Sequence, residues 1–365
     1  MGNDGSPEFQ PGRDELGFSM ERDLLCTADM SGRFTSLNAA WERALGWSRE
    51  ELMARPFIEF VHPDDVAPTA EAAASLAEPD HELHAFENRY KVKDGGWRWL
   101  RWSARSDGET LFAIASDVTE AKEAEQRLRQ ALAENRLLAY SQPIVEHRSG
   151  RVVQEELLVR LRAGNNGDVL APADFLPEAE RSGLILEIDR WMTAQGLDLA
   201  SRGRNVEVNL SAKSIVDDQF MTDLTEAVRS VGAGARRLVF EITETAALDD
   251  LDAASEFAER LDRLGCRIAL DDFGTGFGSL THLRRLPVHV LKVDISFVSG
   301  LRTNPQDQAL VRGVAAIATE LRMETIAEGV EDAITYRLLG DYRIDRAQGF
   351  LIGRPMPIPV AQTPP

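Results

Sequence analysis

The feature that most constrains the fold is a long alternation of strand and helix patterns, which begins near Tyr140 and continues towards the C-terminus. Short apolar runs typical of buried strands are separated by longer stretches typical of helices. The predicted strands are Val152–Leu158, Val206–Leu210, Leu238–Ile242, Arg267–Leu270, Val290–Val293, Thr325–Ala327 and Ala347–Leu351, with helices such as Pro172–Gly183, Asp218–Val231, Asp249–Leu264 and Asp307–Leu321 between them. This order predicts a (β/α)-type barrel, in which catalytic groups lie at the C-terminal ends of the strands.

The residues at these strand ends are chemically unusual. Almost every end offers a charged or metal-competent side chain: Glu156, Asn209, Glu241, Asp271, Asp272, Lys292 and Glu328. Acids make up 60 of the 365 residues, so only about one position in six would be acidic by chance. Several acids in one barrel mouth repel each other unless cations compensate them. Oxygen ligands without His or Cys favour Mg²⁺, Mn²⁺ or Ca²⁺ over Zn²⁺.

The stretch RIALDDFGTGFGSL, residues 267–280, concentrates this chemistry. A short apolar run ends in the adjacent carboxylates Asp271 and Asp272, and a loop with three glycines follows. Two neighbouring acids repel unless a cation lies between them, so a shared divalent ion, or a pair of ions, explains them. Taken alone, the stretch is equally consistent with an Asp-Asp turn followed by a flexible glycine loop.

Composition argues against several classes of partner. The net charge of −19 disfavours non-specific binding to a nucleic acid polymer or to an anionic membrane. No apolar run reaches ~18 residues, and the polar N-terminus shows no secretory signal, so no membrane span is expected. The two cysteines, Cys26 and Cys266, form no disulfide framework, which fits a reducing cytoplasm. The opening MGNDGSPEF looks like the remnant of an expression tag, and residues 1–15 are treated as a disordered N-terminus.

Residues from about Leu16 to Thr119 alternate short strand patterns with turns. Runs at 24–27, 32–37, 85–92, 97–103 and 110–116 predict five strands, and the glycine-containing segments 94–96 and 106–108 are the expected turns. In the helical middle, Asn38 is expected to cap a helix that ends at Gly46. Ser48 and Glu51 fit a capping box at the start of the next helix.

This order resembles a PAS sensory domain, in the motifs NAAWERALGWSREEL, VHPDD, KVKDGGWRWLRW and the closing DVT. The resemblance specifies no ligand for the PAS domain, which is left unknown. Cys26 lacks the Asn-Cys-Arg-Phe setting of flavin-adduct light sensors, which argues against photochemistry. His62 and His84 are candidate haem ligands, but a solvated or capping role is favoured for both.

Residues 119–138 contain no glycine or proline and predict one continuous helix. Five positions along it recur at spacings of four, three, four and three residues: Ala124, Leu128, Ala131, Asn135 and Leu138. This seam predicts a connecting helix, residues 120–138, that pairs two subunits. The alternative is a solvated helix that lies against its own domain.

The second half of the chain contains seven motifs in order: ELLVR (156–160), NLS (209–211), EITE (241–244), DDFGTGFGSL (271–280), KVD (292–294), EGVE (328–331) and QGF (348–350). Over about residues 138–355 they resemble an EAL domain, the family of cyclic-di-GMP phosphodiesterases. Two positions depart from the family pattern. Leu157 replaces the usual Ala, and Phe277-Gly278 replaces the usual Tyr-Ser in the glycine loop. No functional position is lost.

The resemblance implies a site for two metal ions, with Asp271 bridging them. The implied ligands are Glu156, Asn209, Glu241, Asp271, Asp272 and Glu328. Lys292 would position the attacking water, and Glu328 is also a candidate general base.

Residues around this site have implied roles with open alternatives. Gln142, Arg160 and Gln348 would contact the substrate, although Arg160 could instead form a structural ion pair with Glu156. Glu244 would brace the glycine loop and Glu331 would support Glu328, although both could be solvated loop acids.

The resemblances together imply a bacterial cytoplasmic protein with a TIM-like (β/α)8 barrel, preceded by a small α+β PAS domain and a connecting helix. The expected parts are a disordered N-terminus (1–15), a PAS domain (16–119), a connecting helix (120–138), an EAL barrel (139–358) and a tail (359–365). The expected reaction is hydrolysis of cyclic di-GMP to linear 5′-pGpG by two-metal in-line attack of water, with Mg²⁺ or Mn²⁺ as two ions per active site.

Regulation by the PAS domain is expected within a homodimer that pairs through the EAL domain and the connecting helix. One alternative is a catalytically silent EAL receptor that binds cyclic di-GMP and signals through protein contacts. A second is an interaction scaffold whose EAL half is vestigial.

Overall fold

The computed structural model describes residues 23–76, 81–164, 167–274, 283 and 285–358. The chain divides into two compact units, Met1–Gln126 and Arg127–Pro365, and each unit is considered by itself. The expected tag and tail, and most of the glycine loop that includes Gly276 and Gly278, lie outside the described residues.

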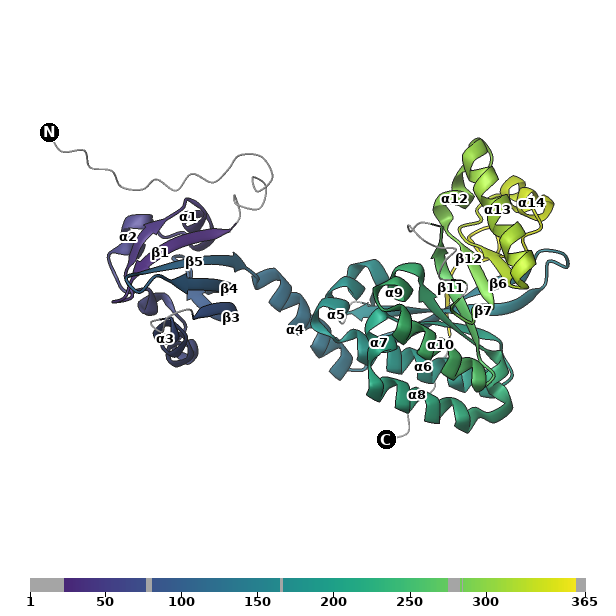
Figure 1. Ribbon diagram of the computed structural model, residues 1–365, viewed down its shortest axis with the longest axis horizontal. Coiled ribbons are helices and arrows are strands. Elements are labelled where there is room, and N and C mark those ends of the chain that lie inside the picture. Colours follow the sequence, from purple (N-terminus) through teal and green to yellow (C-terminus); the bar gives the residue numbers. More distant parts are fainter. Residues whose placement is uncertain (1–22, 77–80, 165–166, 275–282, 284, 359–365) are drawn as a thin grey trace. The chain divides into compact units, whose positions relative to one another are not determined.

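The N-terminal unit is a five-stranded antiparallel sheet with short helices (Figure 1). Its strands are β1 (Leu24–Asp29), β2 (Phe34–Leu37), β3 (Glu82–Lys91), β4 (Trp97–Ser106) and β5 (Thr110–Asp117), in the order β2-β1-β5-β4-β3. Between β2 and β3 lie α1 (Ala40–Leu45), α2 (Arg49–Met53), α3 (Val66–Ser75) and two short 3-10 turns at Phe57–Phe60 and Pro63–Asp65. Large aromatic side chains such as Trp41, Tyr90 and Trp102 form its core. All five strands and the α+β class follow the prediction.

Two local predictions in this unit can be checked directly. The capping box is present, because the Ser48 side chain accepts from Glu51 N and the Glu51 side chain accepts from Ser48 N. The predicted cap at Asn38 is wrong, because α1 begins after Ala39. The Asn38 amide instead accepts from Leu25 N and donates to Asp23 O, so it joins the helix region to β1.

The two candidate histidines, His62 and His84, make local contacts in the structure. His62 Nδ1 accepts from Asp64 N and caps the following turn, and its ring lies edge-on to Trp97. His84 is exposed next to Glu82. A cavity of about 70 Å³ lies inside the unit among Cys26, Tyr90 and other apolar side chains. This volume is well below the ~300–1,000 Å³ of pockets that take drug-sized ligands.

The C-terminal unit contains a closed ring of eight strands among the described residues. In ring order these are β6 (Leu137–Glu146), β14 (Arg346–Ala347), β13 (Glu324–Ala327), β12 (Val290–Val293), β11 (Arg267–Phe273), β10 (Leu238–Thr243), β9 (Val206–Asn209) and β7 (Val152–Ala163), which pairs back with β6. Six neighbouring pairs are parallel, whereas β6 is antiparallel to both β7 and β14. Two short strands, β8 (Asp168–Leu170) and β15 (Met356–Pro357), extend the sheet at β7 and β6. The predicted TIM-like barrel is confirmed.

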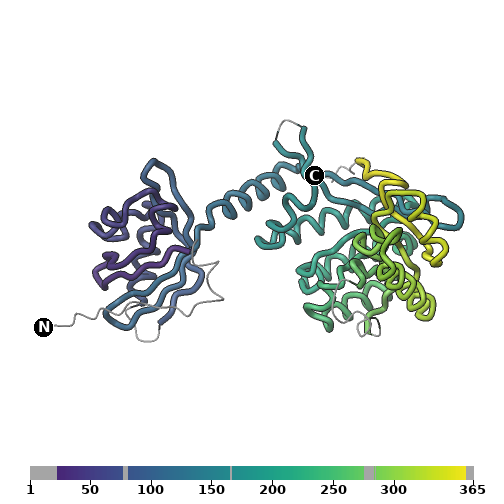
Figure 2. Tube along the Cα trace, turned by 90° about the horizontal axis from the view of Figure 1, so that it is seen from above, coloured from purple at the N-terminus to yellow at the C-terminus, as the bar shows by residue number. Residues whose placement is uncertain are grey.

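Helices surround this ring (Figures 1 and 2). They are α5 (Leu176–Ser182), α6 (Ile185–Ser201), α7 (Ala212–Val216), α8 (Asp218–Val231), α9 (Glu244–Asp249), α10 (Leu251–Arg263), α12 (Ile295–Gly300), α13 (Pro305–Leu321) and α14 (Ala333–Asp341). Alternate strand residues, such as Val206 and Val208, pack outward into the core beneath these helices. A separate small cluster of Ile144, Val239, Ala269, Val290 and Ile326 fills the interior of the ring. Among the described helices, none combines the length and apolarity that crossing a membrane would require.

Two predicted elements differ from the structure. The expected last strand, Ala347–Leu351, is reduced to the two residues of β14, because the chain turns at Gly349, where a Cβ would collide with the backbone of Val330. The predicted helix through Leu138 is also wrong at its end. Helix α4 (Thr119–Ala133) stops before Asn135, which has a positive φ of 54°, and Leu138 lies in strand β6. Asparagine tolerates this left-handed conformation better than most residues, which explains the turn at this point.

The seam that was predicted to pair two subunits is not fully exposed on this helix. Leu128 and Ala131 are only 3% and 2% exposed, and both belong to the core of the barrel unit. The last turns of α4 therefore lie against their own domain, as the alternative interpretation had it.

Candidate active site

The inward-facing side chains at the carboxyl ends of the parallel strands form a polar ring. Because alternate strand residues point to opposite faces, the residues two positions beyond the interior cluster also face inward. The ring is made of Gln142, Glu156, Asn209, Glu241, Asp271, Lys292, Glu328 and Gln348. Eight strands separated by long stretches of sequence thus bring the predicted residues into one layer above the apolar interior.

Lys292 lies at the centre of this layer. It is fully buried, and its Nζ is 2.6 Å from Glu241 Oε1 and 2.6 Å from Glu328 Oε1. Glu156 Oε2 and Asp271 Oδ1 follow at 3.6 and 3.7 Å. Burial alone would lower the pKa of Lys292, but these four carboxylates together raise it well above its ordinary value. Lys292 is therefore held as a cation by the acids that surround it.

Amide side chains hold Glu156 in place. Asn209 Nδ2 donates to Glu156 Oε1 at 2.8 Å, and Gln348 Nε2 donates to Glu156 Oε2 at 2.6 Å. Gln348 Nε2 also lies 3.0 Å from Gln142 Oε1, and Gln142 donates in turn to the carbonyl of Gly353. Among the described residues, the hydrogen bonds from these three amides go to Glu156, to Gln142 and to the carbonyl of Gly353, and none goes to another acid of the ring.

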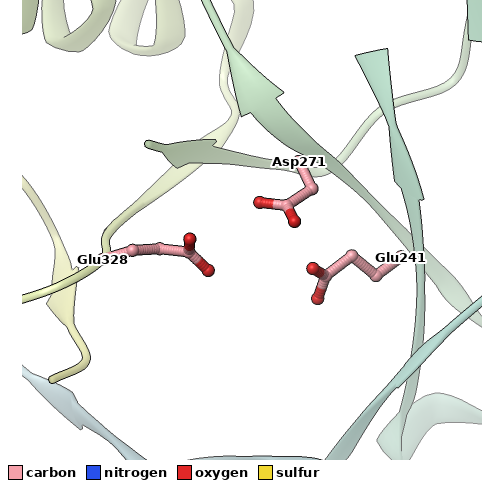
Figure 3. Close-up of side chains that lie close together, drawn as sticks. All are labelled: Glu241, Asp271 and Glu328. Atoms are coloured by element: carbon pink, nitrogen blue, oxygen red, sulfur yellow. The ribbon is translucent and has the colours of Figure 1, made fainter. Parts of the chain in front are cut away.

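Some buried oxygens in the ring have no hydrogen-bond donor among the described residues. Glu241 Oε2 and Asp271 Oδ1 accept no hydrogen bond. Glu241, Asp271 and Glu328 each present an oxygen within 4.8 Å of the other two, and Figure 3 shows the three carboxylates converging. Three converging carboxylates, two of which have an oxygen without a hydrogen-bond donor, fit a hard divalent cation such as Mg²⁺ or Mn²⁺.

Burial in the ring also shifts the pKa values of these acids. Burial raises the pKa of Glu241 well above its ordinary value, and Asp271 and Glu156 add to the effect, although Lys292 opposes it. Burial likewise raises the pKa of Glu328 to about 8, with Lys292 again opposing. The ring therefore holds more negative charge than its one ammonium group compensates.

Asp272 follows Asp271 but points elsewhere. It adopts a positive φ of 55°, and the pairing of β11 with β12 shifts register between Leu270 and Phe273. Burial and Asp271 raise the pKa of Asp272 to about 6, and a hydrogen bond with Asp294 contributes. The backbone irregularity thus separates the two adjacent carboxyls, so that Asp272 stands outside the group of three that converge.

The remaining predicted residues are distributed around the ring. Glu244 is buried at the start of α9, and its Oε2 accepts from Gly274 N at 3.0 Å, at the entry to the glycine loop. Arg160 lies over the ring of Tyr140 and donates to the carbonyl of Val159, so it forms no ion pair with Glu156. Burial lowers the pKa of Arg160. Glu331 is exposed, and no hydrogen bond or ion pair connects it to Glu328 in the described part of the chain.

A cleft of about 500 Å³ opens beside Glu156 and Asn209, within the ~300–1,000 Å³ range of small-molecule sites. Its walls come from β7, α5, α6, α7 and α9, with apolar side chains such as Leu176, Ile188 and Met192. Lys213 is a cation of this wall that the sequence analysis did not identify. The sequence signal for this role was the position of Lys213, four residues after the predicted ligand Asn209.

Glu207 is a second residue that the sequence analysis missed. It lies on β9 between Val206 and Val208, is fully buried, and faces the interior of the ring. Burial raises the pKa of Glu207 to about 7, although Lys292 opposes this. The signal was the alternation in VEVN, which places Glu207 on the same face as Asn209.

The chain is similar to known proteins in both sequence and structure. Residues 125–355 match the family model described as EAL domain, and residues 34–110 match the model described as PAS fold. The chain is 33% identical over 289 residues to the bifunctional diguanylate cyclase/cyclic di-GMP phosphodiesterase MucR of Pseudomonas aeruginosa, a match that covers 76% of this chain and 41% of MucR. It is 34% identical over 236 residues to the cyclic di-GMP phosphodiesterase PdeR of Escherichia coli, covering 63% of this chain and 35% of PdeR.

Solved structures agree with the sequence matches. The MucR phosphodiesterase in complex with c-di-GMP superposes with a TM-score of 0.60 at 34% identity, covering 64% of this chain and 98% of that one. The FimX EAL domain of Pseudomonas aeruginosa bound to c-di-GMP has a TM-score of 0.60 at 28% identity, covering 64% and 96%. The chain spans 42% of the length of uncharacterised Mycobacterium proteins that are 34% identical to it, so it corresponds to less than half of these curated relatives.

Proposed function

This chain belongs to the EAL-domain family, and from that premise we propose that it hydrolyses cyclic di-GMP to linear 5′-pGpG. The observation that carries the proposal is the buried ring around Lys292, in which two carboxylate oxygens have no hydrogen-bond donor among the described residues, beside a cleft of about 500 Å³. The names of MucR and PdeR, which include cyclic di-GMP phosphodiesterase activity, support the choice of substrate.

The proposed metal ligands are Glu156, Asn209, Glu241, Asp271, Asp272 and Glu328. Five carboxylates and one amide oxygen fit two Mg²⁺ or Mn²⁺ ions, and the oxygens of Glu241 and Asp271 that lack a hydrogen-bond donor among the described residues support this assignment. Bound there, such ions supply charge neutralisation at the phosphodiester and acidification of water. Asn209 would exchange its present hydrogen bond with Glu156 for a contact through its carbonyl oxygen, which requires the amide to rotate.

The reaction forms one bond and breaks one. The oxygen of water attacks the phosphorus, the bond to the ribose 3′ oxygen breaks, and that oxygen takes up a proton from solvent. Lys292 Nζ orients the water, and Glu328 accepts a proton from that water. Glu328 is chosen because its side chain is the most exposed of the four acids that contact Lys292. Arg160, Gln142 and Gln348 contact the substrate, and Glu244 holds the entry of the glycine loop.

We further propose that the PAS domain tunes this activity through helix α4, within a homodimer. The proposed domains are a PAS domain ending at Thr119, a connecting helix shortened to α4, and an EAL barrel from about Leu137. The contribution of the helix to subunit pairing is not retained, because Leu128 and Ala131 are buried in the barrel core.

The test is cleavage of cyclic di-GMP by the full chain after removal of metals. Chromatography of the nucleotides should show pGpG with added Mg²⁺ or Mn²⁺, little product with Ca²⁺, and none with chelator, because Ca²⁺ is larger and prefers more ligands. Glu241→Gln should abolish turnover, whereas the matched exposed variant Glu226→Gln on α8 should not change it.

Two outcomes would contradict the proposed function. Full turnover in metal-free protein would rule out the two-metal scheme. Binding of cyclic di-GMP without cleavage under every metal condition would instead identify a receptor.

A further inference from the structure

Glu207 occupies a position beneath the ring. It lies opposite Glu156 of β7 and Val239 of β10 in the register of the sheet, two residues before Asn209. Its side chain is fully buried. The interior cluster of Ile144, Val239, Ala269, Val290 and Ile326 occupies the same level of the barrel. A carboxyl group therefore stands where the surrounding strands mostly contribute apolar side chains.

This carboxyl has no hydrogen-bond partner among the described residues. Both Glu207 oxygens are buried and unpartnered. The guanidinium of the nearby Arg346 binds other groups: it donates to Gln154 Oε1 at 2.8 Å and lies 2.7 Å from Glu324. Removing an unpaired carboxyl from water opposes folding, so Glu207 does not stabilise the cation-free barrel.

Lys292, which is fully buried in the ring, lowers the pKa of the Glu207 carboxyl and so opposes the effect of burial. In the structure Lys292 is compensated by Glu156, Glu241, Asp271 and Glu328. Divalent ions in the ring would take oxygens from these same acids and leave the ammonium beside them. A carboxylate one layer below keeps negative charge near Lys292 and offsets the repulsion between ammonium and cation.

We propose that Glu207 is a positioning residue that strengthens divalent-cation binding by the ring through its charge, without being a ligand. This inference rests on the proposed function for the location of the ions. The buried Glu207 carboxyl, which is unfavourable for folding, would then stabilise the protein only when the ions are bound.

The proposal predicts opposite effects of one substitution on two measurements. Glu207→Gln keeps the size of the side chain and removes its charge. Mn²⁺ alone should bind the full chain at least ~10-fold more weakly in this variant, because a nearby unit charge in a partly polar interior is worth more than a factor of ten. The thermal midpoint of the cation-free protein should stay the same or rise.

Three comparisons make the experiment decisive. Glu207→Asp retains the charge and should retain most of the Mn²⁺ affinity, and Glu226→Gln on the exposed face of α8 should change neither measurement. Glu241→Gln should weaken Mn²⁺ binding, which places the measured ion in the ring.

Three results would overturn the inference: unchanged Mn²⁺ affinity in Glu207→Gln, a lower midpoint of its cation-free form, or Mn²⁺ binding that Glu241→Gln does not affect. Failure of the proposed function is distinguishable. A wild-type chain that binds Mn²⁺ in the ring, responds to Glu207→Gln as expected and yet leaves cyclic di-GMP intact would contradict the hydrolase and not the role of Glu207.

Discussion

Lys292 shows how one residue organises the site. A lysine this deeply buried would ordinarily lose its proton, but four carboxylates within 3.7 Å keep it charged. The acids in turn depend on it, because without the ammonium they would repel each other in a water-excluded layer. Lys292 is thus both a structural counter-ion in the cation-free protein and the group proposed to orient water.

Replacing Lys292 with Met separates these two roles. We expect kcat at saturating Mn²⁺ to fall by at least ~10²-fold with little change in KM, because orientation of water contributes mainly to the transition state. The cation-free protein should also lose about 3–5 kcal/mol of unfolding free energy, the usual effect of breaking a buried ion pair. Mn²⁺ should restore much of this stability, since it neutralises the same acids.

Steady-state kinetics and thermal unfolding with and without Mn²⁺ check both expectations. Lys91→Met, on an exposed lysine at the end of β3, is the control for loss of a surface charge. A kcat near the wild-type value would show that Lys292 is only structural.

At the scale of elements, the junction between α4 and β6 is where the pattern of the sequence was most misleading. The segment after Ala133 lacks glycine and proline, so it continues the helical pattern. Leu137 nevertheless begins a strand, because β6 is needed to close the ring between β7 and β14. The same folding places Leu128 and Ala131 of the preceding helix in the core of the barrel unit.

Leu128→Ala should therefore act on stability and not on subunit pairing. We expect a loss of about 2–5 kcal/mol in the unfolding free energy of the barrel, the range for truncation of a buried leucine. Gln126→Ala, an exposed position on the same helix, should change it by less than about 0.5 kcal/mol. Denaturant unfolding gives both values, and light scattering gives the oligomeric state. A dimer that dissociates in Leu128→Ala without loss of stability would instead support the subunit seam.

At the scale of the whole molecule, helix α4 belongs to both units. Near its start, Lys122 pairs with Glu87 at 2.6 Å and lies over the ring of Trp99, all within the N-terminal unit. Near its end, Leu128 and Ala131 are fixed in the barrel core. The boundary between the two units thus falls within this helix, after Gln126.

Insertions between these two sets of contacts test whether the helix transmits a signal. One residue inserted after Gln126 turns everything that follows by about 100°, whereas seven residues nearly restore the phase. We expect the single insertion to change the basal rate of cyclic di-GMP hydrolysis or its response to the PAS domain, and the seven-residue insertion largely to preserve both. Hydrolysis rates of the three proteins are the measurement. Equal rates and equal responses in all three would exclude transmission through α4.

Much of the site followed from the sequence alone because its signals are local. The alternation of each strand places Glu156, Glu241 and Lys292 inward, and the end of each strand is visible in the sequence, so their meeting at one mouth was predictable. The Ser48–Glu51 capping box is local in the same sense, since both partners lie within one turn of helix.

Only the tertiary structure decided the features that depend on closure of the ring. Strand β6 and the short β14 are strands because they have neighbours to pair with, and no local preference required this. Likewise, the separation of Asp272 from Asp271 arises from the shifted pairing of β11 with β12. The isolation of Glu207 arises because its neighbours inside the barrel come from strands far away in the chain. Pattern determines which face a side chain occupies, whereas its partners across the barrel are known only once all eight strands are in place.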